Sequence, residues 1–174
     1  RIKTDIGTDL VMNIENRIVH KDYGIIKDKG DFGNLPAGEA DLSPKESSCN
    51  GKLYIDGSVL MKKIKEPIKV QIKDGYARKF TGGPLAKKLK STLDSYGKKA
   101  FNIAELGIGT NRQAIITGNI LEDEKVYGTC HIAFGNNKSY GGKIDVPIHL
   151  DAVIKNPTII CDNQTILKKG QSVI

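Results

Sequence analysis

Apolar and polar residues alternate along much of this chain, and a period of two is typical of β-strands that bury one face. The alternation is clear over 52–60 and 68–80, and Asp74-Gly75 adds a hairpin turn signal to the second segment. Five further segments also read as strands or strand ends: 101–109, 126–134, 143–154, 157–162 and 165–169. Strands therefore dominate the predicted fold.

One segment, 84–96, has helical periodicity instead. Its apolar side chains form a single stripe: Leu85, Leu89, Leu93 and Tyr96. It begins with a proline, which suits a first helical turn, and Gly97 suits the C-terminal cap. A second, shorter helix is predicted near 111–120. The expected class is α+β, a strand-rich single domain over 1–174 with one or two helices.

The first third of the chain is less regular. Residues 1–30 carry two β-rich stretches around Arg17 and Gly24. Residues 30–51 are dense in Gly, Pro, Ser and Asn and predict a long loop. A loop of that length in a compact domain is usually functional or disordered.

Composition restricts the class of protein. The chain has 174 residues, 39% of them hydrophobic and 27% charged, which excludes a disordered chain. No run approaches the roughly 18–20 apolar residues that a membrane span needs. The net charge of +7 suggests a nucleic-acid partner, but aromatic residues make up only 6% of the chain and none is interleaved with the lysines. We therefore expect neither a nucleic-acid nor a membrane partner.

The chain contains three cysteines, Cys49, Cys130 and Cys161, which are too scattered for a disulfide framework. We expect them to be structural or free. The chain begins at Arg1 without an apolar signal segment, so it reads as a processed or excised piece of a longer protein. Unpaired thiols and the lack of an export signal favour a cytoplasmic location.

The sharpest local signal for chemistry is His149-Leu150-Asp151. Residues i and i+2 of a strand point to the same face, so the imidazole and the carboxylate lie together and the apolar neighbours face the other way. Such a pair is a natural half-site for a metal ion. The plainer alternative is a hydrogen-bonded His–Asp pair at the end of a strand.

Other side chains complete a mixed nitrogen and oxygen donor set. His131 shares a strand face with Thr129 and Ala133, opposite Cys130. Glu105 has apolar flanks, where a carboxylate is costly unless a cation or donors compensate it. Glu39 and Glu124 are further candidates, with a solvated loop as the plain alternative for each. The set suits a hard or borderline divalent metal and not a thiolate zinc finger.

Four segments carry a family resemblance: GNLPAGEA (33–40), NIAELGIGTN (102–111), GNILEDEKVYGTCHIAFG (118–135) and IHLD (148–151). With Gly7-Thr8-Asp9-Leu10 and Arg17, they resemble the thermophilic-type metallo-aminopeptidase family, the aminopeptidases called T and S. The motifs follow the order of that family and extend over nearly the whole chain.

The resemblance implies a dinuclear site for zinc, cobalt or manganese. Its metal ligands would be Glu39, Glu105, His131, His149 and Asp151, with Glu105 as the bridge and Glu124 as a sixth candidate. Glu39, Glu124 and Tyr140 are the candidates for catalytic groups.

The activity implied is that of a metal-dependent aminopeptidase. A hydroxide activated by two metal ions would hydrolyse N-terminal residues from a peptide. Members of the family are about twice this length, so the chain would be the catalytic C-terminal part of a two-domain protein. Its partners would be a peptide substrate and the missing N-terminal domain, and a homodimer also fits.

A mononuclear non-haem iron(II) ring-cleaving dioxygenase is the alternative. His131, His149 and Asp151 have the composition of the two-histidine, one-carboxylate triad of such enzymes. Glu39 and Glu105 discriminate between the two enzymes, since a mononuclear site does not need them. The presence of both glutamates favours the peptidase. A third alternative is a non-catalytic binding or scaffold domain.

Overall fold

The computed structural model describes residues 1–174 and contains two antiparallel sheets. The first sheet has eight strands in the order β15-β14-β13-β1-β2-β5-β8-β9. Their bounds are Ile2–Lys3 (β1), Asp9–Val11 (β2), Asn50–Ile55 (β5), Ile68–Lys73 (β8), Tyr76–Thr81 (β9), Thr158–Cys161 (β13), Gln164–Lys168 (β14) and Gln171–Ser172 (β15). Asp74 and Gly75 both have positive φ and form the predicted turn between β8 and β9.

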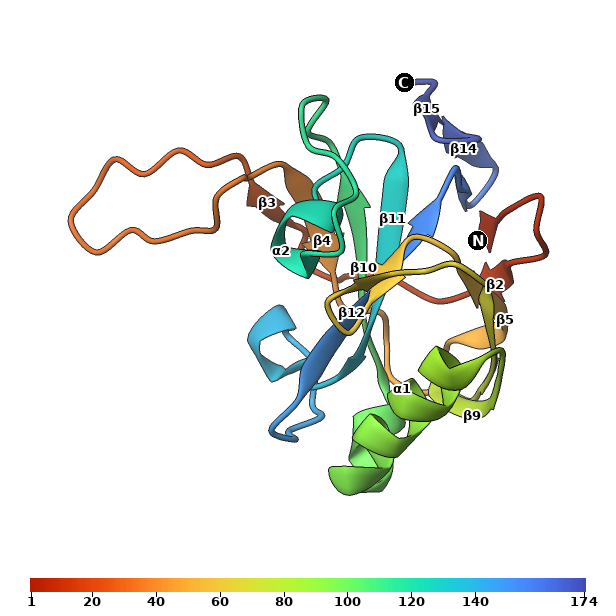
Figure 1. Ribbon diagram of the computed structural model, residues 1–174. Helices are drawn as coiled ribbons and strands as arrows, with labels where there is room; N and C mark the ends of the chain where they lie inside the picture. Colours follow the sequence, from red (N-terminus) through yellow and green to blue (C-terminus); the bar gives the residue numbers. More distant parts are fainter.

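The second sheet has seven strands in the order β3-β4-β10-β11-β12-β6-β7. Their bounds are His20–Asp22 (β3), Glu39–Leu42 (β4), Ser58–Val59 (β6), Lys62–Lys63 (β7), Ile103–Gly109 (β10), Thr129–Gly135 (β11) and His149–Lys155 (β12). Figure 1 shows β10, β11 and β12 through the centre of the molecule, with a long loop projecting outward between β3 and β4.

The helices are few, as expected. The helix α1 (Pro84–Ser95) follows the predicted stripe and buries Ala86, Leu89 and Leu93. The second helix, α2, spans only Ile120–Asp123, so the prediction of a helix over 111–120 was wrong in position. Two 3₁₀ turns, Lys98–Phe101 (η1) and Lys138–Tyr140 (η2), complete the set. No helix is both long and apolar enough to cross a membrane.

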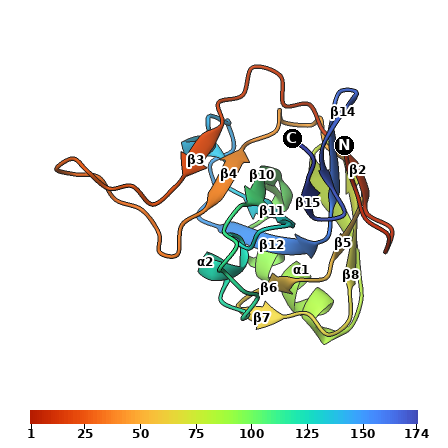
Figure 2. The same ribbon diagram turned by 90° about the horizontal axis from the view of Figure 1, so that it is seen from above.

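The predicted loop over 30–51 needs a correction. It contains β4 and the start of β5, so Glu39 begins a strand and is not held by a loop. β4 forms because its backbone pairs with β10 on one side and with β3 on the other. The predicted loop is confirmed only for the projecting part before Glu39 (Figure 2) and for 43–49, the connection between β4 and β5.

The core lies between the two sheets and takes one face of the central strands. Cys130, Ile132 and Phe134 of β11 are completely buried there, beside Ala152 and Ile154 of β12. The predicted alternation is confirmed, because Cys130 points away from His131. All three cysteines are free. The opposite face of β11 and β12 carries His131, His149 and Asp151.

Candidate metal centre

Strand register gathers the polar side chains on one face of the second sheet. Residues that oppose each other in an antiparallel pair share a face. The opposing pairs run across five strands: Asp22↔Glu39, His20↔Asp41, Asp41↔Gly107, Glu39↔Gly109, Gly107↔His131, Glu105↔Ala133, Ala133↔Asp151 and Gly135↔His149. A register shift beside Glu105 marks a β-bulge, an irregularity common next to active sites. The face is thus a continuous row of histidines and carboxylates.

One group on this face consists of Glu105, His149 and Asp151, whose ligand atoms all lie within 4.8 Å of one another. His149 Nε2 is 2.9 Å from Glu105 Oε2 and 3.4 Å from Asp151 Oδ1. On the other side of the ring, Nδ1 donates to the Asn136 carbonyl at 2.8 Å. That hydrogen bond leaves the Nε2 lone pair facing the carboxylates, which is the usual orientation of a metal-binding histidine.

A second group consists of Glu39, Glu124 and His131. His131 Nε2 is 3.6 Å from Glu39 Oε2 and 3.1 Å from Glu105 Oε1. Glu105 therefore joins the two groups. The structure brings all six predicted ligands together, but it divides the triad of His131, His149 and Asp151 between the two groups.

A buried lysine occupies the second group. Lys125 follows α2 and is fully buried. Its Nζ is 2.5 Å from Glu39 Oε1, 2.6 Å from Glu124 Oε1 and 3.7 Å from Asp22 Oδ2. Burial lowers the pKa of Lys125, but the two glutamates outweigh that effect and raise it. The ammonium group thus supplies a permanent positive charge between Glu39 and Glu124.

The electrostatics of the first group suit a cation. Burial alone would lower the pKa of His149, but Asp151 and Glu105 raise it to about 11. Burial raises the pKa of Glu105, and contacts with His131 and His149 reverse this and lower it to about 2. Each histidine thus becomes cationic beside its carboxylates, and a metal ion would take over the charge of those protons.

Several buried polar atoms of the site have no hydrogen-bond partner, namely Glu39 Oε2, Glu105 Oε2, Asp151 Oδ1 and His131 Nδ1. Glu105 Oε2 is close to His149 Nε2, but the contact lacks the angles of a hydrogen bond. Buried polar atoms are normally paired, so unpaired oxygens that converge with an imidazole nitrogen indicate a missing ligand. The donor set of Glu105, His149 and Asp151 fits a divalent first-row metal.

Tyr140 lies at the edge of this site. Its ring stacks on His149, with centroids 5.1 Å apart and planes inclined by 16°. Burial and the neighbouring carboxylates raise the pKa of its hydroxyl well above the usual range. The Tyr140 hydroxyl is therefore neutral at neutral pH.

The loop that carries Tyr140 is fastened by Arg17. The guanidinium donates to the Gly141 carbonyl and to Glu46 Oε2, each at 2.7 Å. Glu46 Oε1 in turn accepts from Asn137 Nδ2 at 3.1 Å and from the Lys143 amide at 2.7 Å. This network explains why Arg17 accompanies the motifs of the site.

Replacing Arg17 with alanine is expected to lower the free energy of unfolding by about 1.5–3 kcal/mol, the range for hydrogen bonds to charged groups. It should also release Tyr140 from His149, which the near-ultraviolet circular dichroism of tyrosine would report. The exposed Lys79→Ala is the control and should change neither quantity. Unchanged stability and spectrum in Arg17→Ala would contradict this role.

Sequence reasoning missed five residues of the site: His20, Asp22, Asp41, Gly107 and Lys125. The segment His20-Lys21-Asp22 repeats the spacing of His149-Leu150-Asp151, and Glu39 and Asp41 alternate in the same way, so this signal was present. Gly107 carried no signal. A Cβ there would lie 2.1 Å from the His131 ring, so only glycine lets that ring lie across β10.

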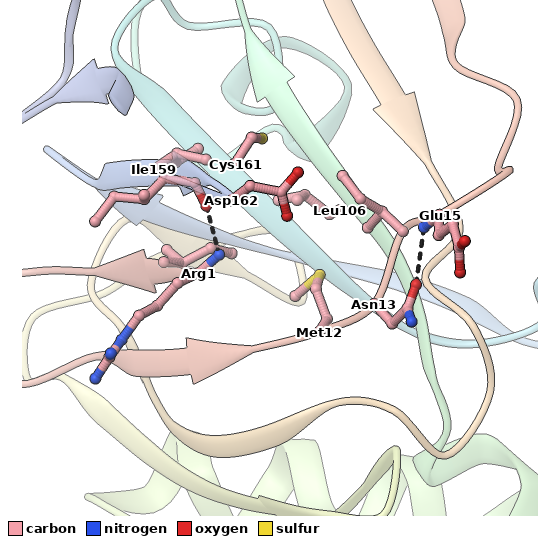
Figure 3. Close-up of a pocket in the computed structure, with 11 residues that line it drawn as sticks. Arg1, Met12, Asn13, Glu15, Leu106, Ile159, Cys161 and Asp162 are labelled. Atoms are coloured by element: carbon pink, nitrogen blue, oxygen red, sulfur yellow. Dashed lines mark hydrogen bonds between the residues drawn. The ribbon is translucent and has the colours of Figure 1, made fainter. Parts of the chain in front are cut away.

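A pocket of about 540 Å³ lies elsewhere, between β1, β10, β13 and the segment that follows β2 (Figure 3). Its lining includes Arg1, Met12, Cys161 and Leu106, and Leu106 faces the side of β10 opposite to Glu105. The polar row on the second sheet does not line this pocket.

Comparison with known families decides the relationship. Residues 1–174 match the NicX family, described as 2,5-dihydroxypyridine 5,6-dioxygenase. The chain belongs to the NicX family. A curated relative, the 2,5-dihydroxypyridine 5,6-dioxygenase of Pseudomonas putida, is 24% identical over 186 residues, which cover 99% of this chain and 53% of the relative. This NicX chain thus spans about half the length of that relative.

Two solved structures share the fold. The 2,5-dihydroxypyridine dioxygenase of P. putida KT2440 matches with a TM-score of 0.90 and 23% identity, over 99% of this chain and 54% of its own. AmpT of Thermus thermophilus matches with a TM-score of 0.74 and 19% identity, over 99% and 49% respectively. The resemblance to aminopeptidase T is therefore confirmed as a relationship of fold.

The family assignment overturns the predicted activity. The match is to dioxygenases, so the predictions of a metallo-aminopeptidase, a hydrolase and a peptide substrate were wrong. The two-ion site for zinc, cobalt or manganese also lacks support. The physical reason is Lys125, since the second carboxylate group already holds an ammonium ion.

Proposed function

We propose that this NicX chain binds one iron(II) ion and serves in the oxidative ring cleavage of a dihydroxypyridine. The main support is the convergence of Glu105, His149 and Asp151, with unpaired buried oxygens on both carboxylates. Carboxylate and imidazole ligands suit iron(II). This set replaces His131 of the sequence prediction with Glu105. His131 then holds the other oxygen of Glu105.

Charge favours one ion over two. A single ammonium group, Lys125, already lies 2.5 and 2.6 Å from Glu39 and Glu124 and offsets part of their negative charge. A second divalent ion between them would have to displace the ammonium of Lys125, which is fully buried. The first group contains no such internal cation apart from its histidine protons.

The chain's own residues prepare the site in distinct ways. The Asn136 carbonyl fixes the ring of His149, and His131 orients Glu105. The flat ring of Tyr140 covers one side of His149 and offers an aromatic surface for another ring. When bound, iron(II) would supply the electrons that allow dioxygen to react with an aromatic ring.

The proposal predicts oxygen uptake. The chain is loaded anaerobically with iron(II), 2,5-dihydroxypyridine is added, and oxygen consumption is followed beside the loss of the aromatic absorbance. We expect one oxygen molecule consumed per ring lost. Asp151→Asn should abolish both signals, and the exposed control Asp145→Asn should preserve them. Release of amino acids from a peptide without oxygen uptake would contradict the proposal.

A further inference from the structure

The third histidine of the chain lies beside the candidate metal ligands and is not one of them. His20 is in β3, directly opposite Asp41 of β4. Its Nδ1 is 3.1 Å from Asp41 Oδ1. The Asp41 side chain is 7% exposed and that of His20 is 40% exposed. The pair therefore spans the boundary between the buried polar row and the solvent.

The hydrogen bond settles the chemistry of the ring. The carboxylate of Asp41 can only accept, so Nδ1 of His20 carries the hydrogen. Nε2 is then the basic nitrogen, and it has no partner within the protein. A histidine oriented in this way by a buried carboxylate is the common arrangement of a general base, because the carboxylate stabilises the imidazolium that forms.

Two contacts between aromatic rings connect the His20–Asp41 pair with the group of Glu105, His149 and Asp151. The His20 ring is 5.5 Å from the Tyr140 ring, which in turn stacks on His149. On the other side, Asp41 lies opposite Gly107, the residue over which the His131 ring passes. The ring of Tyr140 thus lies between His20 and His149, a proposed iron ligand. His20 itself contacts none of the proposed ligands.

Few ionisable groups face His20. Asp41 faces it from β4, and Tyr140 faces it from η2 as a neutral hydroxyl. On its own strand, Asp22 is the next residue on the same face, and it is 3.7 Å from Lys125. Burial raises the pKa of Asp41, and the charge of Glu105 raises it further. The hydrogen bond with His20 acts in the opposite direction and lowers it. Asp41 is therefore the carboxylate that orients the His20 ring.

We propose that His20 and Asp41 are the acid–base pair of this site. As a dihydroxypyridine binds, a ring O–H bond breaks and its proton forms an N–H bond with His20 Nε2. The negative charge stays on the ring oxygen, and Asp41 stabilises the imidazolium. No electron changes hands in this step. The inference rests on the proposed function, because it takes a ring hydroxyl as the proton donor.

The test uses the bound substrate as its own indicator. Ring anions of hydroxypyridines absorb at longer wavelength than the neutral forms, so the spectrum of 2,5-dihydroxypyridine bound without oxygen reports its protonation. The wild-type chain with iron(II) is expected to bind the anion at neutral pH. His20→Gln should bind the neutral ring, with unchanged iron content and ~10²-fold or greater loss of kcat/KM. Lys21→Gln, on the opposite face of β3, should match the wild type.

The outcomes separate the two proposals. If His20→Gln binds the anion at the same pH as the wild type, the role of His20 is refuted and the proposed function stands. If the wild type binds no dihydroxypyridine at all, both proposals fail. Asp41→Asn provides the second variant. It keeps the size of the side chain and should raise the pH at which the bound substrate becomes an anion. An unchanged pH for this transition would refute the role of the pair.

Discussion

Replacing Glu105 with alanine is expected to abolish iron binding. Glu105 contributes an oxygen to the group with His149 and Asp151, and its other oxygen contacts His131. Loss of a group that only orients a ligand typically costs 10–100-fold in metal affinity, so loss of a ligand should cost more than ~100-fold. Iron content after equilibrium dialysis measures the effect. The exposed Glu66→Ala is the control.

Two histidine variants distinguish a metal ligand from a residue that only orients a ligand. His149→Ala should remove iron as completely as Glu105→Ala, because both residues belong to the same group. His131→Ala should retain iron with weaker affinity, since His131 only orients Glu105 in this account. Equal loss from His131→Ala and His149→Ala, with Glu105→Ala unaffected, would restore the triad of His131, His149 and Asp151.

Replacing Lys125 with methionine is expected to destabilise the protein by about 3–5 kcal/mol, the usual cost of leaving a buried charge without its partner. Lys125 is fully buried, and its removal leaves Glu39 and Glu124 facing each other. Burial, partly offset by His131 and Lys125, raises the pKa of Glu39 to about 7, so this carboxyl already resists ionisation. Urea unfolding measures the change in the free energy of unfolding.

The Lys125 variant also tests why the site takes one ion. Without the ammonium group, Glu39, Glu124 and His131 become an open donor set. The metal content of Lys125→Met should therefore rise from one ion per chain toward two. Lys155→Met is the matched control, because that lysine is largely exposed and 3.9 Å from Asp56. Such a pair contributes less than about 1 kcal/mol. Unchanged stability in Lys125→Met would refute the role of Lys125.

Local pattern predicted much of the fold. Alternation located β8, β9, β11 and β12, and helical periodicity located α1, because each signal depends on neighbours along the chain. β4 escaped notice, since its four residues become a strand only by pairing with β3 and β10. The same limit hid the short helix α2, whose position depends on how it packs over the sheet.

The candidate site was predicted in part for the same reason. His131, His149 and Asp151 are visible through their spacing, and Glu105 through its apolar flanks. Lys125 is adjacent to Glu124 in sequence, but nothing local shows that it is buried between two glutamates. Taking Glu39 and Glu105 as signs of a second metal ion led to the wrong activity. The charge of Glu39 is balanced by a lysine instead.

The most direct test of a single iron centre is the anomalous X-ray signal of iron in crystals prepared with iron(II) in the absence of oxygen. We predict one peak per chain, within bonding distance of Glu105, His149 and Asp151. Two peaks, or a single peak between Glu39 and His131 with Lys125 displaced, would contradict the account.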